Sequence, residues 1–201
     1  MSSSANMQGV QWPPSLLLVV RRHLEHVEDA VAPSIPPMPS SSPSIYEFFE
    51  SHRDALEGEM RTCSYDPTVT ECCIAFLIGV LEQACALSFL LSRERRIIAM
   101  TVRQVEKRLS KSRTAAPETK RRRLDEAAAT ESRYARVLTL EYLLRLYVSL
   151  PMILEHYDKL GSAAMPGYAT APLWCFINIS LRLLSSNNRL FSPITSYVPL
   201  R

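Results

Sequence analysis

The sequence predicts an all-α protein, and three observations support that prediction. The chain of 201 residues has only five glycines, and its 14 prolines lie mostly outside the segments with helical periodicity. Apolar residues recur at three-and-four spacing along several long segments. The longest of these, residues 66–113, contains one glycine and no proline after its second residue. We therefore expect a flexible N-terminal arm, residues 1–14, followed by a single helical domain, residues 15–201.

The segment 66–113 is expected to form one long helix on which the domain is built. Asp66 and Pro67 suit the first turn of a helix, and Thr68 with Glu71 has the spacing of a capping box. The first half is apolar almost all round, whereas the second half is basic and keeps one apolar stripe. An unbroken helix of this length would exceed roughly 60 Å, so we expect it to bend or to meet a partner.

Residues 72–91 also have the length and apolar character of a transmembrane span, and three arginines at 93–96 would suit its flank. However, Glu82 and Gln83 fall near its centre, where a carboxylate costs about 2.5–3.5 kcal/mol on insertion scales. These two residues favour a helix of a protein core over a membrane span.

Four further helices are expected on the same grounds of periodicity and capping. They are residues 15–31, 44–62, 124–150 with a continuation to 160, and 172–184. The second of them begins with another capping-box pair, Ser44 and Glu47. The last is rich in β-branched and aromatic residues and admits a strand, but its apolar residues recur at three-and-four spacing, which favours a helix.

Three segments between or after these helices lack helical periodicity. Residues 32–43 contain five prolines and four serines, which is typical of a linker or an ordered loop. A breaker that contains Pro117, residues 113–118, follows the long segment and precedes a basic run. The last residues, 185–201, are expected to form a turn and an extended C-terminal tail.

The reactive residues do not predict an enzyme, a metal site or a cofactor. The sequence contains no phosphate-binding glycine loop, no nucleophile elbow and no carboxylate pair placed in a plausible cleft. The five cysteines lie mainly in apolar helical segments without zinc-ligand spacing, so we expect buried thiols in a reducing compartment. His23 and His26 lie among charged residues, and we expect them on a solvated face rather than as metal ligands.

Two basic clusters have the spacing of a bipartite nuclear-import signal. They are Lys107 with Arg108 and, after eleven intervening residues, the run Lys120, Arg121, Arg122 and Arg123. The pattern predicts a nuclear location, and a solvated loop between two helices is the alternative. Nucleic-acid contact is a second alternative, but no aromatic residues are interleaved to stack on bases, and a net charge of +3 does not predict a polyanion binder.

The segment 143–148 reads Leu-Leu-Arg-Leu-Tyr-Val and resembles the Leu-Leu-Arg-Leu-Phe-Val segment of the MRG domain of MORF-related chromatin proteins. Residues 190–192, Leu-Phe-Ser before a proline-containing tail, are similar to the end of that domain. Two weaker similarities come earlier. Residues 90–95 resemble a family segment ending in Phe-Glu-Arg, although they are one residue shorter. Met38-Pro39 followed by Ile45–Phe49 resembles a Leu-Pro before an Ile-Leu-Glu-Asp-Tyr helix.

These similarities run in the order of the family and cover about residues 15–200. The chain departs from the family in three ways. The basic segment 107–135 is an insertion, Leu24 stands where the family has a tryptophan, and no chromodomain precedes the helical domain. Methyl-lysine recognition is therefore not expected.

The resemblance implies an MRG-like helical domain that acts as a non-catalytic adaptor in a histone acetyltransferase or deacetylase complex. The family domain has a hydrophobic groove for short apolar segments of partner subunits, including an MRG-binding protein. By position, the groove would be lined by Leu24, Leu91 and Val148, with Ser149 where the family has an arginine. Two other functions stay open: a helical subunit of a replication assembly such as GINS, and a membrane-anchored protein with its span at 72–91.

Overall fold

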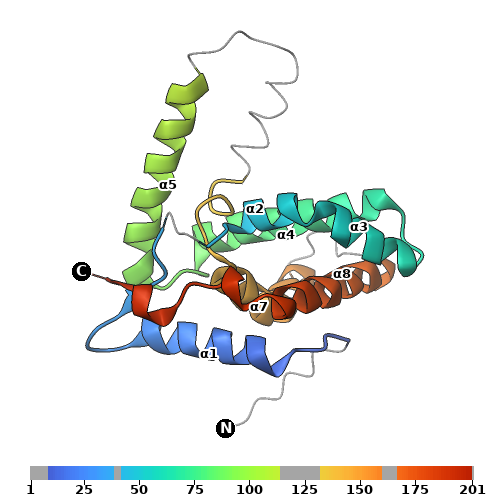
Figure 1. Ribbon diagram of the computed structural model, residues 1–201, viewed down its shortest axis with the longest axis horizontal. Helices are drawn as coiled ribbons and strands as arrows, with labels where there is room; N and C mark the ends of the chain where they lie inside the picture. Colours follow the sequence, from blue (N-terminus) through green and yellow to red (C-terminus); the bar gives the residue numbers. More distant parts are fainter. Residues whose placement is uncertain (1–8, 39–41, 114–131, 160–166, 201) are drawn as a thin grey trace.

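A computed structural model of the chain describes residues 9–38, 42–113, 132–159 and 167–200. Within these ranges the protein is all-α, as predicted, with one short two-stranded sheet (Figure 1). The helices are α1 (Pro14–Glu28), α2 (Ile45–Ser51), α3 (Arg53–Thr62), α4 (Pro67–Leu87), α5 (Ser92–Arg113), α7 (Leu140–Lys159) and α8 (Gly167–Ser186). Two 3-10 turns follow α8, at Asn188–Leu190 and Ile194–Ser196.

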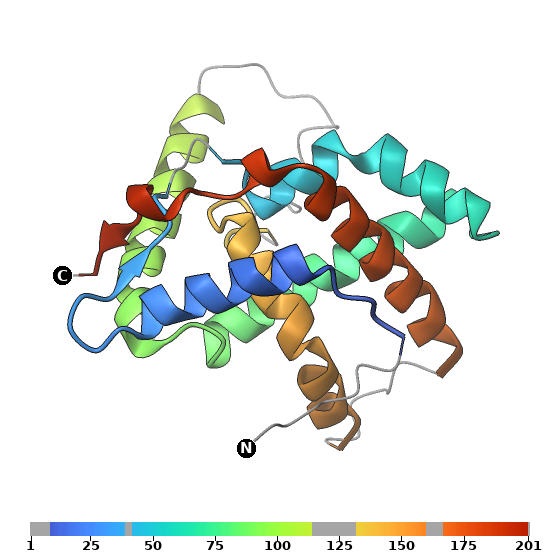
Figure 2. The ribbon, with the colours of Figure 1, turned by 60° about the horizontal axis from the view of Figure 1, so that its bottom comes forward.

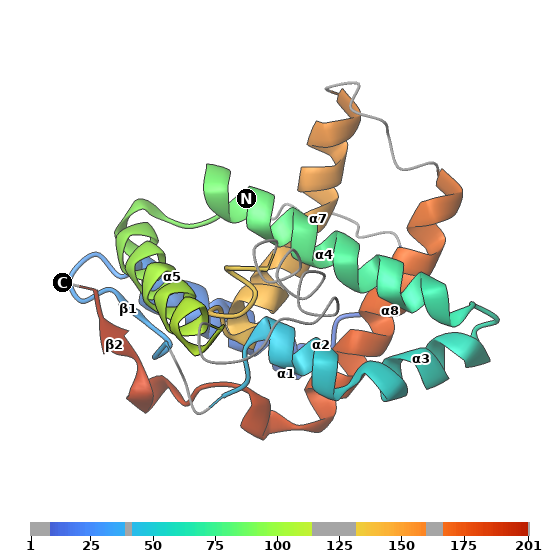
Figure 3. The same cartoon turned by 90° about the horizontal axis from the view of Figure 1, so that it is seen from above.

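Helix α7 forms the centre of the fold. Every side chain from Val137 to Tyr147 is buried. Helix α1 lies across α7 (Figure 2), and α2 packs near its first turn. Helix α8 packs against α1, α3 and α4 and completes the core around α7 (Figure 3). The domain is thus organised around α7, because this is the segment that other helices enclose.

The segment 66–113 is not one helix, so that prediction is wrong, whereas the expected bend is present as a break between α4 and α5. After Leu87 the backbone of Ser88 leaves the helix with φ −142°. The side chain of Glu94 accepts the N–H of Leu91 at 2.8 Å and caps the new helix. Arg95 Nη2 donates to the carbonyls of Leu87 and Leu90 at 3.0 and 3.2 Å, which satisfies backbone acceptors that the break leaves open.

The expected helix 124–150 is also wrong at its start. Residues 124–131 lie outside the described ranges, residues 132–137 form turns, and the helix begins at Leu140. Glu82 of α4 accepts the N–H groups of Tyr134 and Ala135 at 2.6 and 3.0 Å, so the turn is held by α4. At the other end, α7 continues through Pro151 without a break.

Capping was predicted correctly at one helix and in part at another. The capping box of Ser44 and Glu47 is present at the start of α2, although the expected helix 44–62 divides at His52 into α2 and α3. Asp66 caps α4 by accepting the N–H of Thr68 at 2.9 Å. Glu71 does not take part in that cap and forms an ion pair with Arg53.

The ends of the chain are tied to the core where they are described. Asn178 of α8 bonds the backbone at Gly9 and Gln11, so the expected flexible arm, residues 1–14, is held from residue 9 onward. Within the proline- and serine-rich loop, strand β1 (Ser34–Ile35) pairs antiparallel with β2 (Val198–Pro199) of the tail. The loop is therefore ordered in its described part, and the tail is extended as predicted.

Candidate functional site

A buried polar cluster joins α7 to the break between α4 and α5. Glu94 is fully buried, and its carboxylate accepts Arg145 Nη1 at 2.8 Å. The same arginine donates to the backbone carbonyl of Phe89 and lies over the Phe89 ring, 4.8 Å from its centroid. Tyr142 donates its hydroxyl to the other oxygen of Glu94 at 3.2 Å. The charge of Arg145 is thus paired and hydrogen-bonded, as a buried charge must be.

Helix α1 reaches the same cluster through His23. Its ring packs edge-on against Tyr142, with the centroids 4.8 Å apart, and the Tyr197 hydroxyl lies 3.4 Å from its Nδ1. Burial, with a smaller contribution from Arg145, lowers the pKa of His23 to about 3. The ring is therefore neutral near neutral pH, and our expectation that it lies on a solvated face is wrong.

The four predicted partner-binding residues lie on the elements that this cluster joins. Leu24 follows His23 on α1, Leu91 donates its N–H to Glu94, and Val148 lies one helical turn after Arg145 on α7. Leu24, Leu91 and Ser149 are half-buried, and Val148 is 39% exposed. A hydrogen bond from Arg93 to the carbonyl of Asp29, 3.0 Å long, also joins the start of α5 to the end of α1.

Two further exposed apolar side chains lie on α4 and α7 and were not predicted from the sequence. Leu87, at the end of α4, is 69% exposed, and Met152, one turn beyond Val148, is 71% exposed. Figure 3 shows the second half of α7 extending beyond α4, away from α5. The spacing of Val148 and Met152, four residues apart, is the signal that could have identified a shared helix face.

The residues of the predicted import signal are only partly described. Lys107 and Arg108 are exposed near the end of α5. Lys120, Arg121, Arg122 and Arg123 lie outside the described residues.

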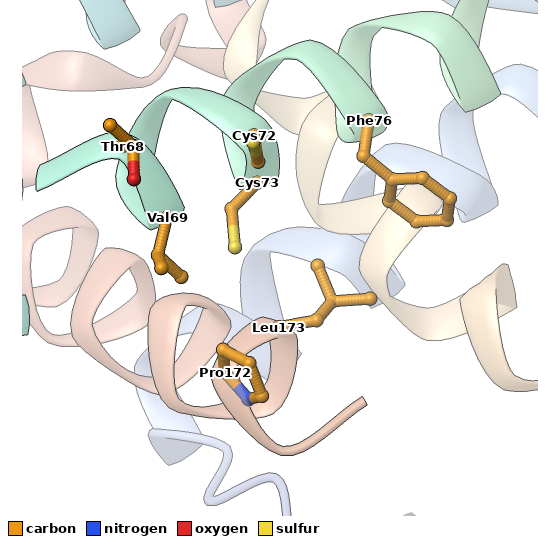
Figure 4. Close-up of a pocket in the computed structure, with 7 residues that line it drawn as sticks. All are labelled: Thr68, Val69, Cys72, Cys73, Phe76, Pro172 and Leu173. Carbon is orange, nitrogen blue, oxygen red and sulfur yellow. The ribbon is translucent and has the colours of Figure 1, made fainter. Parts of the chain in front are cut away.

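A pocket of about 220 Å³ lies elsewhere, between the first turns of α4 and the start of α8 (Figure 4). It is lined mainly by apolar side chains: Thr68, Val69, Cys72, Cys73, Phe76, Pro172 and Leu173. Burial raises the pKa of the Cys73 thiol to about 11, so this sulfur is not a ready nucleophile. A second pocket, of about 370 Å³, lies between α5 and β2. Neither pocket is lined by a predicted partner-binding residue.

The cysteines are free thiols, but the expectation that they are buried is only partly correct. Cys73 and Cys85 are buried, whereas Cys63 and Cys72 are exposed. In the part of the chain that the structure describes, no group of three or more His, Cys, Asp or Glu side chains is placed to hold a metal ion.

Helix α4 is long and apolar enough to cross a membrane by length and composition. In the fold it packs against α3 and α8, and Glu82 near its middle binds backbone N–H groups of another segment. Burial raises the pKa of this carboxyl to about 7. These are contacts of a helix within a protein core.

A scan against protein-family models finds no family that matches this chain, and a search of curated proteins finds no relative.

Proposed function

We propose that this chain is an MRG-like, non-catalytic adaptor subunit of a nuclear histone acetyltransferase or deacetylase complex. It binds short apolar segments of partner subunits, an MRG-binding protein among them, at the junction of α1, the α4–α5 break and α7. We call this the junction surface: Leu24, Leu87, Leu91, Val148, Ser149 and Met152.

The observation that carries the proposal is the exposure of apolar side chains on the elements that the buried polar cluster joins. Leu87, Val148 and Met152 remain open to solvent next to the segment whose sequence resembles the family. Scattered exposed leucines are ordinary, but several from separate elements at one junction are typical of an interaction surface. The buried pair of Glu94 and Arg145 supports the proposal further, because it fixes the α4–α5 break relative to α7.

The chemistry of this surface favours an apolar segment as its ligand. Burying apolar surface contributes roughly 25 cal/mol for each Å² removed from water, so one large apolar anchor contributes about 1.5–3 kcal/mol. Affinity would then depend on a few anchor residues rather than on charge.

The proposal is tested by affinity purification of the tagged protein from nuclear extracts, followed by mass spectrometry. We expect subunits of a histone acetyltransferase or deacetylase complex to co-purify. Val148→Asp and Met152→Asp should lose these subunits, because the partner's anchor would have to desolvate a carboxylate. Both positions are exposed enough for the carboxylate to stay hydrated in the free protein, so helix content and Tm should stay near those of the unmodified chain.

Leu18→Asp is the matched control, since Leu18 is 44% exposed and lies on α1 about 120° around the helix from Leu24. It should keep every partner. Unfolding of Val148→Asp would mean that this position is core, and partners retained by both junction variants would place the binding surface elsewhere. Replication factors as the co-purifying proteins would favour the GINS-like alternative. Retention in the membrane pellet after carbonate extraction would favour an anchored protein.

A further inference from the structure

Two cysteines that are far apart in the sequence meet where α3 packs against α8. Cys63 ends α3, and Cys175 lies on α8. Both are free thiols, and a hydrogen bond joins their side chains. Cys63 is exposed, whereas Cys175 is half-buried. The fold therefore holds a pair of thiols in contact, and solvent reaches the pair through Cys63.

The packing of α3 on α8 holds the two thiols together. Figure 3 shows the two helices side by side, and Arg182 of α8 forms an ion pair with Glu59 of α3 at 2.9 Å. Cys175 precedes Arg182 by seven positions, which places the two side chains within about 20° of each other around α8. Cys63 follows Glu59 by four positions, so both lie on the same side of α3. The ion pair and the thiol pair thus join the same two helix faces.

The backbone at Cys63 gives its sulfur freedom to move. The N–H of Cys63 donates to the carbonyl of Met60 at 3.0 Å and closes the last turn of α3. The next residue, Ser64, has φ +66°, so the chain leaves the helix immediately after Cys63. In a disulfide the two sulfurs lie about 2.05 Å apart. Rotation of the exposed Cys63 side chain shortens the distance to Cys175 without displacing a following helical turn.

The two thiols differ in their reactivity. Burial, followed by the hydrogen bond to Cys63, raises the pKa of Cys175 to about 11, so this thiol stays protonated near neutral pH. Thiol–disulfide exchange requires a thiolate that can reach the oxidant. Cys63 is exposed and meets that requirement first. Cys63 is therefore suited to attack an oxidant, and Cys175 is suited to complete the bond.

A third thiol near the pair is shielded from solvent. Cys73 of α4 is buried, and burial, with smaller contributions from Cys72 and Cys175, raises its pKa to about 11. An oxidant in solution cannot reach this sulfur directly. Cys73 is the alternative partner for Cys175, but the exposure of Cys63 favours the pair across α3 and α8.

We propose that Cys63 and Cys175 form a reversible disulfide in the native fold when the protein meets a small disulfide such as oxidised glutathione. The Cys63 thiolate attacks one sulfur of the oxidant, whose S–S bond breaks, and the first glutathione thiolate leaves and takes up a proton. Cys175 then gives its proton to water, and its sulfur attacks the Cys63 sulfur and releases the second glutathione thiolate, which also takes up a proton. The protein loses two electrons, and the small disulfide gains them and becomes two thiols.

This bond would connect the end of α3 to α8 across a loop that contains α4, α5 and α7. A disulfide that closes a long loop restricts the unfolded chain and thereby stabilises the fold. The inference does not depend on the adaptor function proposed above.

The test is incubation of the folded protein with oxidised glutathione, alkylation of the remaining thiols in denaturant, and tryptic digestion without a reductant. Trypsin leaves Cys63 in the peptide 62–93 and Cys175 in the peptide 160–182, so mass spectrometry detects their link directly. We expect this link in monomeric protein, its loss after treatment with dithiothreitol, and a Tm at least about 4 °C above that of the reduced protein.

Cys63→Ser and Cys175→Ser should each abolish the link, with far-UV circular dichroism unchanged. The matched control is Cys72→Ser, which removes another exposed thiol and should keep both the link and the rise in Tm. Persistence of the link in Cys63→Ser would overturn the proposal, because another cysteine of the same peptide would then be the partner. The proposal would also be overturned by loss of the link in Cys72→Ser, by a link found only in covalent dimers, or by a lower Tm of the oxidised protein.

Discussion

Replacing either member of the buried pair Glu94–Arg145 should destabilise the fold strongly, and the two replacements should not cost the same. Arg145→Met leaves a carboxylate that still accepts the Leu91 N–H and the Tyr142 hydroxyl. Glu94→Leu leaves a guanidinium that cannot lose its proton, and among the described residues the Phe89 carbonyl remains as its hydrogen-bond acceptor. It also removes the acceptor of two buried donors.

We expect a loss of about 3 kcal/mol in the free energy of unfolding for Arg145→Met, the lower end of the range for a broken buried pair. We expect about 5 kcal/mol for Glu94→Leu, the upper end of that range. The double variant should cost about 3–4 kcal/mol rather than the sum, because neither charge is then left unpaired. The remaining cost is about 1 kcal/mol for each buried group that loses its partner, namely the Leu91 N–H, the Tyr142 hydroxyl and the Phe89 carbonyl.

The assay is urea unfolding followed by far-UV circular dichroism, with Arg133→Met as the matched control. Arg133 lies 3.9 Å from Glu106, and both side chains are almost half exposed, so its loss should cost less than about 1 kcal/mol. Glu94→Gln should lose an amount of unfolding free energy between those of Arg133→Met and Glu94→Leu, since the amide keeps an acceptor for the Leu91 N–H but loses the charge. The reasoning is refuted if the single losses simply add in the double variant, or if Arg145→Met costs no more than Arg133→Met.

Two further predictions concern pH and localisation. The pKa of His23 is lowered from 6.5 to about 3 in the fold, so the unfolded chain binds the extra proton between these values. The stability that depends on neutral His23 should be fully present above about pH 6.5 and be lost toward pH 3, and His23→Gln should show a fall smaller by roughly 5 kcal/mol in denaturant titrations across that range. The raised pKa of Glu82, about 7, makes stability fall as pH rises above 4.5, and it does so in both proteins. A steeper fall toward pH 3 in His23→Gln than in the unmodified chain would contradict the assignment to His23. Replacing Lys120, Arg121, Arg122 and Arg123 by alanine should leave a fluorescently tagged protein mainly cytoplasmic, whereas an unchanged nuclear signal, or an unmodified protein that is never nuclear, would exclude the import signal.

The all-α fold and several helix ends were predictable because the interactions that decide them are local. The capping box at Ser44 needs only Glu47, and the cap at Asp66 needs only Thr68. The apolar stripe of α5 is visible in the sequence, and so is its charge, although the total of +3 hid how unevenly that charge is distributed.

The candidate site was predictable only in part. The resemblance directed attention to Leu24, Leu91 and Val148, and three elements that meet at one junction carry them. The exposure of Leu87 and Met152 depends on which segments pack against them, and this is decided by the tertiary structure. The burial of His23 was missed because charged residues surround it in the sequence, whereas Tyr142 and Tyr197 surround it in space.

By itself, the sequence determined where helices are favourable, because capping and periodicity involve residues within about four positions of each other. The tertiary structure alone decided where the long apolar segment breaks and where α7 begins. The break at residues 88–91 is stabilised by Arg145, which lies 56 residues beyond Phe89, and the turn before α7 is held by Glu82, 52 residues before Tyr134. Such donors and acceptors meet only once the chain has folded, and they outweigh a helical propensity of at most about 1 kcal/mol per residue.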